Sequence, residues 1–122
     1  SCPAIQVARL RGDLLSGLIV ESGFADTLGL LSRIGFPTRG LQIPQQWRSI
    51  NLDGIRQVKL PTLVIHGQWD QIIPLEDGMA LFQACKAARK ELVVIPRAGH
   101  NDLFWAGAER YMGAIASFIE QG

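Results

Sequence analysis

Cysteine and histidine are both scarce in this sequence. The 122 residues include two cysteines, Cys2 and Cys85, and two histidines, His66 and His100. The cysteines belong to no CxxC pair, so nothing has the spacing of a zinc site, and we expect no metal and no cofactor. We interpret the cysteines as free thiols in a reducing compartment and expect a cytoplasmic location, with a Cys2–Cys85 disulfide left open as the alternative.

An excess of charge and long apolar runs are also lacking. Twelve Lys and Arg residues face eleven Asp and Glu residues, for a formal net charge of +1. This balance gives no electrostatic reason to expect a nucleic-acid partner. The sequence contains no run of ~18 apolar residues, so we expect no transmembrane helix. The chain begins with Ser1-Cys2-Pro3 and has no signal-peptide pattern, although a removed N-terminus would leave none.

What is present suits one α/β unit over residues 1–122. The composition is 48% hydrophobic, which is ordinary for a globular domain. Apolar periodicity and turn residues place the elements. We expect strands over 17–21, 61–67 and 92–96, helices over 2–11, 25–35, 75–89 and 102–120, a helical turn over 51–58, and a loop over 36–46.

Polar residues at the expected helix ends suggest caps. Asp26 or Thr27 suits the start of the second helix, and Asn51 or Asp53 suits the helical turn. The helix from residue 75 carries acidic residues in its first turn. Its last turn is expected to hold three basic residues, which the helix dipole favours: Lys86, Arg89 and Lys90.

Strands that alternate with helices predict a parallel sheet with right-handed crossovers. Three strands make a small sheet of this class, flanked by helices on both faces. At least one edge should be an unpaired, apolar strand, and such an edge favours pairing with another chain. We therefore expect self-association through the exposed sheet edge.

Two loops deliver polar residues to the same edge of this sheet. Asp70 follows the strand over 61–67, and His100 follows the strand over 92–96. Active sites of open parallel sheets lie beyond the carboxyl ends of the strands, so these two side chains are expected to meet. A carboxylate bonded to one imidazole nitrogen fixes the tautomer and leaves the other nitrogen as a general base.

The motifs around these residues resemble those of the α/β-hydrolase superfamily. The segment 66–74 reads HGxxDxxIP after a strand, and 98–100 reads AGH after the next. The segment GLIVESGFAD over 17–26 is similar to the strand that follows the nucleophile-bearing helix in that family, and HND over 100–102 occurs in some members. The nearest resemblance is to the α/β-hydrolase-domain branch of serine hydrolases.

This resemblance implies a partial α/β-hydrolase fold, the C-terminal portion of the domain. Asp70 would be the acid and His100 the general base of a Ser-Asp-His triad that cleaves an ester, thioester or amide of a small-molecule acyl substrate. Trp69 would line the substrate pocket, with a packing role as the alternative. Residues 36–57 would occupy the position of the family's lid, as a short insert.

The nucleophile that the resemblance calls for is missing. Family order is nucleophile, acid, histidine, with the nucleophile in GxSxG, and no GxSxG occurs here. Ser1 does not qualify, because Pro3 stands where the motif needs glycine. We expect the serine and the oxyanion donors upstream of Ser1, residues 2–11 to be the rest of the nucleophile helix, and the chain alone to be inactive.

Two alternatives stay open at this point. An Asp or Cys nucleophile, as in dehalogenase or dienelactone-hydrolase types, would leave the acid and histidine loops looking alike. A non-catalytic interaction module would instead use the sheet edge for binding, but that edge should then be polar, and residues 18–20 and 64–65 are apolar.

Other polar residues near the site favour structural roles. His66 ends a strand and is expected to pack beside the following turn. Asp102 is expected to cap the last helix. Glu21 and Ser22 end the first strand, where backbone contacts or capping are expected rather than tuning of His100. Cys85 is expected in mid-helix, without the strained turn that presents a nucleophile.

Overall fold

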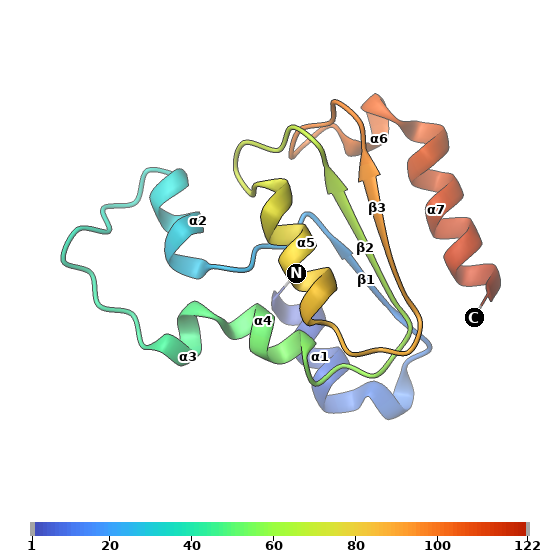
Figure 1. The fold of residues 1–122 in the computed structure, drawn as a ribbon, viewed down its shortest axis with the longest axis horizontal. Helices are drawn as coiled ribbons and strands as arrows, with labels where there is room; N and C mark the ends of the chain where they lie inside the picture. The colour runs from blue at the N-terminus through green and yellow to red at the C-terminus, as the bar shows by residue number, and fades with distance from the viewer. Residues whose placement is uncertain (1, 122) are drawn as a thin grey trace.

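A three-stranded parallel sheet forms the centre of the chain in the computed structural model, which describes residues 2–121 (Figure 1). The order is β1-β2-β3, with Val64 opposite both Val20 and Leu92. Helices connect these parallel strands, so the α/β class expected from the sequence is confirmed. The strands are β1 (Leu18–Glu21), β2 (Thr62–Gly67) and β3 (Lys90–Ile95).

Helices cover both faces of the sheet. One face carries α1, α4 and α5, and α7 packs against the other (Figure 1). A short 3₁₀ turn, η1 (Gly12–Leu14), follows α1. The helices are α1 (Cys2–Arg11), α2 (Thr27–Arg33), α3 (Gln45–Arg48), α4 (Ile50–Ile55), α5 (Leu75–Ala84), α6 (Leu103–Ala106) and α7 (Ala108–Gln121).

The central strand β2 supplies side chains to two separate cores. Val64 packs with Leu18 and Val20 of β1 in the core beneath α1, α4 and α5. Leu63 and Ile65 point the other way, into the core beneath α7. Every residue of β2 is buried. Burial on both faces explains why its sequence is a continuous apolar run rather than an alternating one.

Helix α5 is shorter than the sequence predicted. It ends at Ala84, and Cys85 already has an extended backbone with ψ 129°. Lys90 opens β3 opposite Thr62 and is not part of the helix. The expectation of basic residues in the last helical turn is therefore wrong. Lys90 nevertheless reaches back, because its Nζ donates to the carbonyls of Phe82 and Cys85 at 2.8 and 3.0 Å.

The C-terminal helix is divided where a single helix over 102–120 was expected. Gly107 separates α6 from α7. A Cβ at this position would lie 2.7 Å from Cγ2 of Ile95, at the end of β3. The chain thus passes so close to the sheet at Gly107 that only glycine fits, and the helix breaks there.

The segment from α2 to α3 projects away from the sheet (Figure 1). Asp26 caps α2, as expected, by accepting from the N–H of Leu28 at 3.1 Å. It also pairs with Arg48 of α3 at 3.1 Å, and this hydrogen bond lowers the pKa of the Asp26 carboxyl. The pair ties these two short helices together.

The start of α4 differs from the expected one. Ser49 stands at the N-cap, where Asn51 or Asp53 was expected. Asn51 is instead buried within the helix, and its Nδ2 donates to the carbonyl of Phe24 at 2.8 Å. Helix α4 thereby holds the chain that leaves β1 on its way to α2.

The sheet has two outer edges. Among residues 2–121, β1 and β3 each pair only with β2. The expected self-association through such an edge stays a prediction. No helix within this part of the chain combines the length and the apolar character needed to cross a membrane.

Candidate active site

The loop after β2 holds Asp70 in a fixed orientation. Oδ1 of Asp70 accepts from the N–H groups of Ile72 and Ile73 at 2.9 and 2.8 Å. The side chain of Asp70 is fully buried. Because Oδ1 accepts hydrogen bonds from its own loop, Oδ2 remains available to a partner from another segment.

The loop after β3 is bonded to the loop after β2. The N–H of Gln68 donates to the carbonyl of Ile95 at 3.0 Å, and the N–H of Trp69 donates to that of Ala98 at 2.9 Å. Oε1 of Gln68 accepts from the N–H of Arg97, whose φ of 62° is unusual for a residue other than glycine. These bonds fix the position of the turn that carries His100.

The two loops bring Asp70 and His100 together. Nδ1 of His100 lies 2.8 Å from Oδ2 of Asp70. Because an ionised carboxylate can only accept, Nδ1 carries the proton and Nε2 of the neutral ring is unprotonated. The imidazole is 29% exposed, whereas the carboxylate is buried. A partly exposed imidazole oriented by a buried carboxylate is suited to act as a general base.

His100 lies between two open hollows. The smaller, of about 340 Å³, includes Trp69, 59% exposed, and Arg97. The larger, of about 500 Å³, is lined by Glu21, Ser22, Phe24, Leu30, Ile72, Ile73 and His100. Sequence reasoning did not single out Phe24, Leu30, Ile72 or Ile73. Their place in this wall could not be read locally, because the segment from Phe24 into α2 and the loop after β2, which are far apart in the chain, form it together.

Two further residues differ from or refine the sequence expectations. Asp102 stands at the N-cap of α6, but its carboxylate accepts from the N–H of Gly99 instead of a helix N–H. Cys85 is the buried residue after α5, not a mid-helix residue. Cys2 and Cys85 are both free thiols. Residues 2–121 contain no group of three or more His, Cys, Asp or Glu side chains placed to hold a metal ion.

Glu21 forms a side-chain hydrogen bond to α7, where a backbone contact or a helix cap was expected. Its Oε2 accepts from the hydroxyl of Tyr111 at 2.8 Å. This hydrogen bond, with burial and the negative charge of Glu21, raises the pKa of Tyr111 above its ordinary value. The neutral phenol is thus favoured by folding. Its contribution to stability is fully present below the pKa of the unfolded chain and is lost as pH rises through the higher pKa of the folded state.

The alkaline titration of Tyr111 tests this contact directly, because Tyr111 is the only tyrosine in the chain. Absorbance near 295 nm should show an apparent pKa above that of a free tyrosine. Glu21→Gln should bring the midpoint back toward the ordinary value, because it removes the charge that opposes ionisation. A midpoint that does not differ between the wild-type chain and Glu21→Gln would contradict the assignment.

Comparison with known proteins identifies the family of this chain. Residues 5–120 match the prolyl oligopeptidase family. Protein bem46 of Schizosaccharomyces pombe is 31% identical over 121 residues, which cover 97% of this chain and 40% of that protein. Human alpha/beta hydrolase domain-containing protein 17B is 37% identical over 71 residues, 58% of this chain and 24% of that protein. The chain thus spans less than half the length of these curated relatives.

Solved structures agree at the level of the fold. A Pyrococcus furiosus esterase superposes with a TM-score of 0.74 at 15% identity, over 98% of this chain and 49% of that one. A monoacylglycerol lipase of Paleococcus ferrophilus superposes with a TM-score of 0.66 at 17% identity, over 97% and 64%. The chain belongs to the prolyl oligopeptidase family of the α/β-hydrolase superfamily.

Proposed function

We propose that this chain supplies the acid, Asp70, and the general base, His100, of a Ser-Asp-His triad in a serine hydrolase. The bond between Nδ1 of His100 and Oδ2 of Asp70, 2.8 Å long, is the observation that carries the proposal. It orients the ring so that Nε2 can take a proton from a serine hydroxyl and return it to the leaving group. The bond cleaved is an ester, a thioester or an amide of a small acyl substrate.

The nucleophile is proposed to lie upstream of Ser1. The sequence contains no GxSxG, and family order places the nucleophile before the acid and the histidine. Within the described residues the outer edge of β1 is free. An upstream parallel strand paired there would end beside Ser22 and the larger hollow, which His100 also lines. A serine in the turn after that strand would then face the imidazole.

Substrate is proposed to occupy the two hollows beside His100. Phe24, Leu30, Ile72 and Ile73 give the larger one apolar walls suited to an acyl group. Trp69 presents an exposed indole to the smaller one and is proposed to contact substrate there.

A fluorophosphonate probe tests the proposal, because it labels an activated serine covalently. We expect the full-length protein to be labelled and the 122-residue chain to remain unlabelled, since the nucleophile and the oxyanion donors lie outside it. Labelling of the 122 residues alone would contradict the upstream nucleophile. A full-length protein that never reacts would contradict the serine mechanism and favour another nucleophile.

A further inference from the structure

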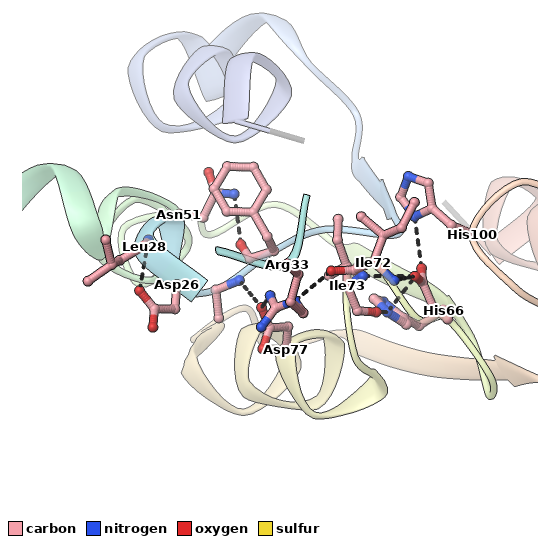
Figure 2. A network of polar contacts seen from close by, with 12 residues as sticks. Asp26, Leu28, Arg33, Asn51, His66, Ile72, Ile73, Asp77 and His100 are labelled. Atoms are coloured by element: carbon pink, nitrogen blue, oxygen red, sulfur yellow. Dashed lines mark hydrogen bonds and ion pairs between the residues drawn. The ribbon is translucent and has the colours of Figure 1, made fainter. Parts of the chain in front are cut away.

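The second histidine of the chain, His66, is completely buried beneath the loop that carries Asp70. It belongs to β2, and its Nε2 lies 2.6 Å from the carbonyl oxygen of Ile73 (Figure 2). Because a carbonyl oxygen can only accept, Nε2 must carry a proton. A neutral His66 therefore has its proton on Nε2, the opposite tautomer to that of His100.

The other nitrogen of His66 has no room for a partner. Nδ1 makes no hydrogen bond with any residue of the described chain. It faces Gly78 of α5 so closely that a Cβ there would lie 2.6 Å from Nδ1. A proton on Nδ1 would have no acceptor among the described residues. Of the two neutral tautomers, the surroundings thus favour the one with its proton on Nε2.

His66 closes a ring of contacts around the acid. Ile73 donates its N–H to Oδ1 of Asp70 and accepts from His66 through its carbonyl. Both the N–H and the carbonyl of Ile73 are thereby hydrogen-bonded. Nε2 of His66 also lies 3.7 Å from Oδ2 of Asp70, the oxygen that accepts from His100. This separation is too long for a hydrogen bond, so Oδ2 stays available to His100.

We propose that His66 is a positioning residue for the pair formed by Asp70 and His100. It acts by holding the carbonyl of Ile73, which fixes the turn so that Oδ2 of Asp70 is aimed at Nδ1 of His100. The inference rests on the proposed function for its catalytic meaning. The contacts that carry it are independent of any reaction. The competing explanation is that His66 only fills space in the core.

The first test measures the tautomers of the wild-type chain labelled with ¹⁵N at histidine. Only two histidines contribute, so long-range ¹H–¹⁵N spectra at neutral pH report each ring. We expect a ring protonated on Nε2, from His66, and a ring protonated on Nδ1, from His100. A His66 that carries its proton on Nδ1 alone would overturn the proposal without any variant, because Nε2 could not then donate to Ile73.

The second test uses two substitutions and a matched control. His66→Leu removes the donor to Ile73, whereas His66→Gln keeps an N–H near the position of Nε2. Hydrogen exchange of the His100 Nδ1 proton should accelerate about tenfold or more in His66→Leu and much less in His66→Gln, because only the first frees the turn. The control, Val58→Ala, opens a cavity in the core that includes β1 and α5. It should lower stability and leave this proton unchanged.

The outcomes separate positioning from packing. Equal acceleration in His66→Leu and Val58→Ala, or none in His66→Leu, would show that His66 merely packs. In the full-length protein, His66→Leu should lower kcat by about ten- to a hundredfold with KM nearly unchanged, as expected for a small misplacement of a catalytic group. If the fluorophosphonate probe never labels the full-length protein while the tautomers and exchange behave as expected, the proposed function fails and the positioning of His100 by His66 stands.

Discussion

Asp70→Asn in the full-length protein is expected to lower kcat by about 10⁴-fold, the loss seen for the equivalent change in serine proteases. Asn keeps an oxygen that accepts from the N–H groups of Ile72 and Ile73, so the turn survives. Its Nδ2 would then face Nδ1 of His100 and donate to it. This forces the proton of the imidazole onto Nε2, where the base must be free. Hydrolysis of an activated aryl ester measures the effect.

The control for this substitution is Asp13→Asn. Among the described residues, the one polar contact of the Asp13 side chain is a long, exposed one of 3.8 Å with Arg11, and such contacts contribute little. It should therefore leave kcat unchanged. A full-length Asp70→Asn enzyme that retains more than a tenth of the wild-type kcat would contradict the role of Asp70 as the triad acid.

The sequence predicted the features that depend on short stretches of chain, namely the strands and the edge of the sheet at which the site lies. The β-branched apolar runs identified all three strands. Strands of a parallel sheet with helices on both faces need such side chains, and β2 is buried throughout while β1 and β3 are buried in part. Parallel topology then places the residues after neighbouring strands at one edge. The proximity of Asp70 and His100 follows from that rule, and their contact is found at 2.8 Å.

What the sequence did not predict depends on contacts between distant segments. Helix α5 stops at Ala84, because Lys90 must already pair with Thr62 in the sheet. The break at Gly107 follows from its approach to Ile95. Helix propensity predicts neither the end of α5 nor the break between α6 and α7, because both are set by contacts with the sheet.

The same limit applies to the site. The sequence predicted that His66 would pack beside the turn, but its bond to the carbonyl of Ile73 needs the path of the loop. The wall formed by Phe24 and Leu30 needs the position of the segment after β1, which Asn51 holds through its bond to Phe24.

Gly67→Ala is expected to have the largest effect on stability, and it acts at the same edge of the sheet. A Cβ on residue 67 would lie 2.4 Å from the carbonyl oxygen of Ala98 and 2.9 Å from that of Gly99. Both atoms are backbone atoms of the turn that carries His100. Moving the turn away from residue 67 would be costly, because the N–H of Trp69 is hydrogen-bonded to the carbonyl of Ala98. We expect a loss of about 3 kcal/mol in the free energy of unfolding, the upper end for overpacking.

Urea unfolding followed by tryptophan fluorescence measures the loss, with Gly113→Ala as the matched control. Gly113 lies in α7, and a Cβ there would meet no atom of the described residues within 4 Å beyond its own helix backbone. Alanine should stabilise the helix at this position by about 0.5–1 kcal/mol. Opposite signs for the same chemical change would show that close packing of the two loops sets the cost at Gly67. Because that packing also seats His100, Gly67→Ala should speed exchange of the His100 Nδ1 proton, and Gly113→Ala should not. Equal stability of the two variants would mean that the loops after β2 and β3 do not pack as closely as described, and the support for His100 would have to lie elsewhere.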